Sequence, residues 1–82
     1  MEDFYKTLRP IRTLRGMKQQ ELAFLLNVRQ QSISKMEIGL IKISSQTAKK
    51  IAVHFGFETK EDMLNFYMSL FNTPLENKKE HE

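Results

Sequence analysis

The sequence predicts a small all-α domain, on three observations. Apolar residues recur at about the 3.6-residue spacing of a helix, in short segments that Asn, Gly and Pro interrupt. The chain has 82 residues, which suffice for one small core but not for two. It has no cysteine, which excludes a disulfide framework and a thiolate metal site. With no export signal and no apolar run of about twenty residues, we expect a cytoplasmic protein.

The first helix is expected near Pro10. Residues 2–8 could be helical, but Pro10 lacks a backbone N–H and disfavours helical geometry at Arg9. The helix therefore either kinks there or starts there, with Pro10 at its first position. Ile11 and Leu14 are its predicted core contacts.

Residues 19–38 predict two short helices that pack across a tight turn. The helical period breaks at Asn27, where the backbone needs a positive φ that Asn accepts more readily than most residues. Ala23 lies where the two helices, residues 18–26 and 30–38, would cross, and only a small side chain fits there. This arrangement is a helix-turn-helix. Its shared apolar face consists of Leu22, Ala23, Leu26, Val28, Ile33 and Met36.

The second of these helices has a polar outer side. The spacing of Ile33 and Met36 points both side chains inward and turns the opposite side outward. The outward side carries amide, hydroxyl and ammonium groups, which bind base edges and phosphates in DNA. Its residues are Gln30, Gln31, Ser34 and Lys35. For the two glutamines, an ordinary solvated helix surface is the alternative interpretation.

A fourth helix is predicted after Gly39, whose position suits a left-handed cap of the third. Residues 40–44 form the loop, and Ser44 or Ser45 caps the new helix. Gly56 ends it. Its core residues, at helical spacing, are Ala48, Ile51, Ala52 and Phe55.

A fifth helix is predicted from Lys60 to about Phe71. Thr59 with Asp62 resembles a capping box at its start, and Pro74 limits its extension. We therefore expect one domain over residues 1–71. The polar, charged residues 72–82 are expected to form a mobile tail.

The charges are unevenly distributed along the chain. Residues 6–50 hold ten Lys or Arg and two Glu, whereas residues 51–82 hold three Lys and six acidic residues. The basic part contains the helix-turn-helix, as expected if this part meets a polyanion. An ordinary charged surface is the alternative.

Several short motifs follow one another in the order Arg-x-x-x-Gly, Gln-x-Glu-Leu-Ala, a small turn residue, and Ile-Ser-x-x-Glu-x-Gly. Their residues are Arg12, Gly16, Gln19, Glu21, Leu22, Ala23, Asn27, Ile33, Ser34, Glu37 and Gly39, followed by Ser44, Thr47, Ile51, Ala52, Phe55 and Gly56. Over about residues 8–65 the chain thus resembles the lambda repressor and Cro-like (XRE-type) helix-turn-helix family. The resemblance implies a compact five-helix domain whose third helix enters the major groove of DNA.

The resemblance also implies roles for individual residues. Arg12 and Glu37 match an ion pair that ties the first helix to the end of the third, although Arg12 could also face a phosphate. Lys49 and Lys50 are interpreted as general surface charge. The implied base contacts are Arg29, Gln30, Gln31, Ser34 and Lys35, and the implied phosphate contacts are Lys18, Gln19 and Lys42.

Lys18 and Arg29 depart from the family pattern. The family usually places Thr or Ser at both positions, where the hydroxyl caps a helix N-terminus. A cation there lacks the cap and opposes the helix dipole. We therefore predict that both residues trade stability for affinity to DNA.

The fifth helix carries more apolar residues than its own small core can bury, which predicts a two-fold homodimer. The alternative is that Phe4, Tyr5 and Leu8 cover this surplus within the monomer. Phe24 occupies a position that is usually polar in the family, and it could belong either to the dimer interface or to the apolar surface that is covered within the monomer. The predicted dimer contacts are Met63, Phe66, Tyr67, Leu70 and Phe71.

The sequence therefore predicts a DNA-binding transcriptional regulator, a repressor that binds a pseudo-palindromic operator as a homodimer and associates with the nucleoid. Two alternatives use the same DNA chemistry. One is an antitoxin that also binds a small protein partner, and the other is the controller of a restriction-modification operon. Catalysis is not expected, because His54 and His81 lie neither at metal-ligand spacing nor beside a nucleophile, and no cofactor or metal is expected.

Overall fold

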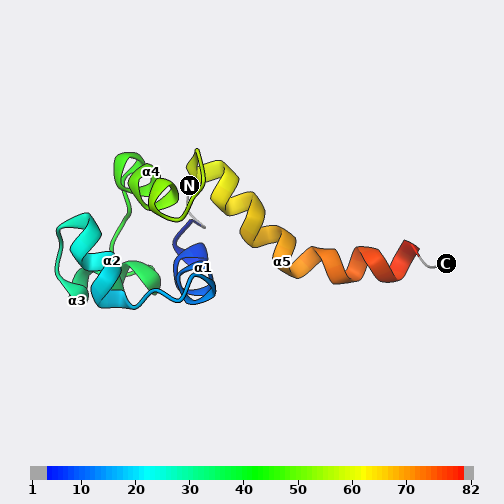
Figure 1. Ribbon diagram of the computed structural model, residues 1–82, viewed down its shortest axis with the longest axis horizontal. Coiled ribbons are helices and arrows are strands. Elements are labelled where there is room, and N and C mark those ends of the chain that lie inside the picture. Colours follow the sequence, from blue (N-terminus) through cyan, green and yellow to red (C-terminus); the bar gives the residue numbers. More distant parts are fainter. Residues whose placement is uncertain (1–3, 81–82) are drawn as a thin grey trace.

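The computed structural model describes the backbone of residues 4–80 and the side chains of residues 4–71. The elements are a 3-10 turn η1 (Phe4–Thr7) and the α-helices α1 (Leu8–Leu14), α2 (Gln19–Leu26), α3 (Gln30–Glu37), α4 (Ser45–His54) and α5 (Lys60–Glu80). These elements confirm the predicted all-α, five-helix fold (Figure 1).

One core holds the helices together. It contains side chains from η1 and from every helix, with Leu8, Ile11, Leu22, Ile33, Ile51 and Met63 fully buried. In Figure 1, α1 to α4 gather at one end of the molecule, and α5 leaves them and projects toward the C-terminus. Among the described residues, no helix is both long and apolar enough to cross a membrane.

The N-terminal region differs from the expectation in two ways. The α-helix begins at Leu8, so Pro10 lies inside its first turn rather than at its first position. Proline is tolerated there because the first N–H groups of a helix have no partner within it. Leu14 was expected in the core but is 58% exposed.

Arg15, the residue after Leu14, packs against the junction between α4 and α5. Its guanidinium lies 5.4 Å from the ring centroid of Phe57 and 5.9 Å from that of Phe66. Its Nε and Nη2 also donate to the carbonyl oxygen of Phe55, at 3.2 and 3.0 Å. Arg15 thereby links the end of α1 to the junction of α4 and α5.

The turn between α2 and α3 has the predicted geometry. Asn27 adopts φ 58° and ψ 46°, and the N–H of Val28 donates to the carbonyl oxygen of Ala23 at 3.0 Å. Ala23 is buried, as its place at the crossing requires. Val28 was expected on the apolar face but is 37% exposed, since it lies in the turn rather than on either helix.

Gly39 ends α3 in the predicted left-handed conformation, with φ +79°. The N–H of Leu40 donates to the carbonyl oxygen of Lys35 at 2.9 Å, which closes the helix end. The ring of Tyr5 covers this glycine so closely that an added Cβ would lie 3.0 Å from its Cζ. The 3-10 turn therefore packs directly on the end of α3.

Replacing Gly39 with alanine is expected to destabilise the protein by about 2 kcal/mol or more, and to lower the Tm by roughly 8 °C or more. Left-handed backbone strain and the contact with Tyr5 both contribute. Gly16→Ala is the matched control, because Gly16 has φ +69° but nothing lies within 4 Å of its added Cβ. Thermal unfolding checks the prediction. An equal fall in Tm in both variants would show that the contact with Tyr5 does not contribute.

The last two helices begin where the sequence predicts. Ser44, rather than Ser45, caps α4, since its Oγ accepts from the N–H of Thr47 at 3.1 Å. The hydroxyl of Thr59 accepts from the N–H of Asp62 at 3.0 Å and caps α5.

The end of α5 corrects the expectation. The helix continues to Glu80 instead of stopping near Phe71. An interior proline costs a helix roughly 3 kcal/mol and bends it, but does not forbid it. Figure 1 accordingly shows α5 changing direction between its yellow and red parts. The first residues of the expected tail therefore belong to a helix. Residues 81–82 lie outside the described part of the chain. The domain boundary at residue 71 stays a proposal.

Candidate nucleic-acid interface

The exposed side of α3 is polar and the opposite side is buried. Gln30 and Ser34 lie four residues apart in one row along the helix, and Gln31 and Lys35 form the next row. All four side chains are exposed, whereas Ile33 and Met36 are buried.

A chain of hydrogen bonds connects α1, α2 and α3 behind this surface. The Nε of Arg12 donates to Oε2 of Glu37 at 2.6 Å and its Nη2 donates to Oε1 at 3.2 Å, so the ion pair is bidentate. Gln19 Nε2 donates to Oε1 of Glu37 at 3.0 Å. Gln30 Nε2 then donates to Oε1 of Gln19 at 3.2 Å. A residue on the outer side of α3 is thus tied to the ion pair.

The ion pair is well shielded from water, with its Arg12 and Glu37 side chains 12% and 4% exposed. Arg12 also donates from Nη1 to the carbonyl oxygen of Met17 at 2.9 Å. All of these bonds run between α1, the α1–α2 loop, α2 and α3, so the ion pair fixes how the three helices sit relative to one another. Arg12 therefore faces the interior of the domain.

An open groove runs along this network. It brings together Lys18 and Gln19 at the start of α2 and Gln30 and Ser34 of α3, four of the residues that the sequence placed at DNA. Arg9 of α1 lines the same groove, although the sequence indicated no binding role for it beyond its place in the basic part of the chain. Its position one helical turn before Arg12 was the signal that could have placed it here.

The starts of α2 and α3 lack side-chain caps. Lys18 and Arg29 occupy the N-cap positions with extended backbone, and neither side chain makes a cap hydrogen bond. At α2 the carboxylate of Glu21 compensates in part, because it accepts from the N–H of Lys18 at 2.7 Å. Both cations are exposed.

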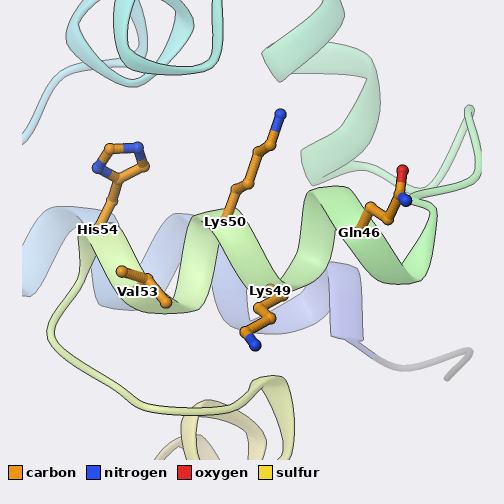
Figure 2. Close-up of a pocket in the computed structure, with 5 residues that line it drawn as sticks. All are labelled: Gln46, Lys49, Lys50, Val53 and His54. Atoms are coloured by element: carbon orange, nitrogen blue, oxygen red, sulfur yellow. The ribbon is translucent and has the colours of Figure 1, made fainter.

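Two other groups of cations lie outside this groove. Lys42 is exposed in the loop between α3 and α4, in a separate hollow lined also by Tyr5 and Gly39. Lys49 and Lys50 line an open hollow on α4 together with Gln46, Val53 and His54. Figure 2 shows Lys50 and His54 pointing to one side of α4, and Lys49 and Val53 pointing to the other.

On α5 the structure divides the predicted dimer residues into two sets. Met63 is 0% exposed and belongs to the monomer core, which corrects its assignment to a dimer contact. Phe66 also packs on the core, with its ring 5.5 Å from that of Phe57. The physical reason is that η1 and α4 pack on this side of α5. The turn η1, which contains the buried Phe4, therefore covers one side of the helix, as the monomer alternative expected in part, whereas Tyr5 lies against Gly39.

The described residues cover a second side of α5 only in part, because Tyr67 packs against the core whereas Met68 and Phe71 are exposed. Leu64, Tyr67, Met68 and Phe71 follow at helical spacing and are half-buried or exposed, with Phe71 57% exposed. The rings of Tyr67 and Phe71 lie edge to face at 5.0 Å. Leu70 is also exposed, beside this stripe.

Phe24 lies on neither side of α5. It is 83% exposed on α2, where it lines a shallow hollow with Met17 and Leu25. In Figure 1, α2 lies at the end of the molecule that is opposite to the C-terminal part of α5. Phe24 therefore adds nothing to the apolar stripe of α5 within one chain.

Comparison with known proteins identifies the family. A family model described as helix-turn-helix matches residues 8–61, most of the chain and all of α1 to α4. Neither the curated proteins nor the solved structures gave a match. Among the described residues, no three His, Cys, Asp or Glu side chains gather to hold a metal ion. The matched region contains the turn at Asn27, the polar side of α3 and the Arg12–Glu37 pair, and the chain belongs to the XRE-type, lambda repressor-like helix-turn-helix family of DNA-binding transcription regulators.

Proposed function

We propose that the chain is a transcriptional repressor that binds a pseudo-palindromic operator as a homodimer. α3 lies in the major groove, where Gln30 and Gln31 read base edges with Arg29, Ser34 and Lys35 beside them. The observation that carries this proposal is the polar, exposed side of α3, which is opposite to its buried residues. Amide groups can donate to and accept from a base edge at the same time.

The groove beside α3 supports a set of phosphate contacts. Lys18 and Gln19 line it at the start of α2, and Arg9 adds a third group from α1. Lys42 reaches a neighbouring phosphate from the loop after α3. Such contacts hold α3, the reading helix, in register on the DNA but carry no sequence information by themselves.

The partly uncovered stripe on α5 supports the homodimer. Two copies that bury Met68, Phe71 and the exposed part of Tyr67 against each other would remove apolar surface that the described part of the monomer leaves in water. A two-fold pair of reading helices binds half-sites about one turn of DNA apart. The operator is therefore expected to be a pseudo-palindrome.

Selection from random DNA tests this function. We expect a symmetric site, and we expect Gln31→Ala to weaken binding to it by about 1 to 3 kcal/mol and to relax the preference at one or two base pairs. Lys42→Ala should instead weaken binding to all sequences alike, as the loss of a phosphate contact does. If the double variant Gln30→Ala/Gln31→Ala selects the same site as the parent, α3 does not read bases through these residues.

A further inference from the structure

The hydrogen-bond chain behind α3 has a defined direction. Each link is a donor facing an acceptor, from the amide of Gln30 to that of Gln19 and from Gln19 to the carboxylate of Glu37. An ionised carboxylate can only accept hydrogen bonds, whereas a glutamine amide can both donate and accept. Of the three side chains Gln30, Gln19 and Glu37, only Glu37 has a role that cannot be reversed.

The carboxylate of Glu37 fixes the orientation of the two glutamine amides that connect it to the outer side of α3. Gln19 must turn its NH2 group toward Glu37, which leaves its oxygen facing Gln30. Gln30 must then turn its own NH2 group toward Gln19. What remains for an outside partner is the oxygen of Gln30 and one of its two N–H groups.

These remaining groups match some base edges better than others. In the major groove, adenine presents the N6–H donor beside the N7 acceptor, so it pairs with one oxygen and one N–H. Guanine presents two acceptors, O6 and N7, and needs two donors. Gln30 can supply two donors only if it gives up its bond to Gln19.

We propose that Glu37 is a positioning residue that sets the base preference of Gln30, selecting adenine over guanine by fixing the direction of the Gln19 and Gln30 amides. The inference rests on the proposed function, because it requires Gln30 to face a base. It assigns Glu37 a role in specificity that the ion pair with Arg12 alone does not require.

Two substitutions release the amide of Gln30 by different routes. Glu37→Gln places an amide where only an acceptor stood, so residue 37 can donate to Gln19 as well as accept from it, and the amides of Gln19 and Gln30 are no longer held in one direction. Gln19→Met removes the acceptor that holds Gln30 and leaves the Arg12–Glu37 pair in place. Arg12→Lys is the control, because it removes the bidentate pair but leaves an acceptor-only carboxylate at residue 37.

The experiment first finds the base pair that Gln30 reads, as the position at which the Gln30→Ala variant loses its preference in selection from random DNA. Binding is then compared on duplexes with adenine or guanine at that position. The parent and Arg12→Lys should prefer adenine by about tenfold to a hundredfold. The preference should fall to about threefold or less in Glu37→Gln and Gln19→Met, and thermal unfolding confirms that each variant is folded.

The ratio of the two affinities separates specificity from stability, because a general weakening of binding cancels in it. If Glu37 has only a structural role, Glu37→Gln melts lower and both release variants keep the preference of the parent, which overturns the inference. If Glu37→Gln fails to fold, the ratio of adenine to guanine affinity measured for Gln19→Met tests the inference by itself. A preference of the parent for any base other than adenine also overturns the inference. A parent that selects no sequence at all refutes the proposed function itself.

Discussion

Replacing Phe71 with glutamate is expected to leave the domain folded but monomeric, and to weaken binding to a full operator by about a hundredfold or more. Phe71 is 57% exposed, so its loss costs the monomer little packing. In the proposed dimer it is buried, and a carboxylate there would lose its hydration without a partner. Joining two reading helices makes the second binding event intramolecular, and this gain disappears in the monomer.

Sedimentation at tens of micromolar and binding to full and half operators check this prediction. The half-site affinity should hardly change, because α3 is untouched. Phe24→Glu is the matched control, since it introduces the same charge at an even more exposed phenylalanine on α2. A Phe71→Glu variant that sediments like a dimeric parent would place the interface elsewhere, and a parent that is monomeric at this concentration would remove the support for a dimer.

The paired variant Lys18→Thr/Arg29→Ser is expected to melt higher and to bind DNA more weakly. Each hydroxyl supplies a missing N-cap worth about 1 kcal/mol, and removing each cation relieves roughly 0.3 to 1 kcal/mol of repulsion with the helix dipole. The Tm should rise by about 4 to 8 °C for each kcal/mol gained.

The loss of binding should depend on salt. Each phosphate contact that is removed makes the slope of log K against log salt shallower by about 0.9, because fewer counterions are released. Lys49→Ala is the control, as Lys49 lines the separate hollow on α4 (Figure 2). An unchanged affinity and salt slope in the paired variant would show that the two cations are not DNA ligands.

The helix-turn-helix could be predicted because its constraints act between near neighbours in the chain. Asn27 could be placed at the turn because the turn needs a positive φ, which Asn tolerates. Ala23 could be placed at the helix crossing because only a small side chain fits there. Ser44 and Thr59 cap helices through bonds that span three residues. Spacing alone also separates the buried Ile33 and Met36 from the exposed residues of α3.

Other features depend on residues that are distant in the chain. Leu14 has suitable spacing for the core, but Arg15 makes the contacts with the α4–α5 junction. Met63 belongs to the same apolar run as Phe71, and only the packing of η1 and α4 on α5 decides which of them is buried. Arg9 lines the groove because α1 lies beside α2 and α3.

The sequence by itself determined the all-α class, the helix-turn-helix and the polar side of α3, because helical periodicity and capping are local properties. Only the tertiary structure decided which side of α5 stays exposed and how the amides of Gln19 and Gln30 are directed. The direction depends on Glu37, which lies 18 residues from Gln19 in the chain. Hydrogen bonds over such separations follow from how the helices pack, and no local pattern encodes them.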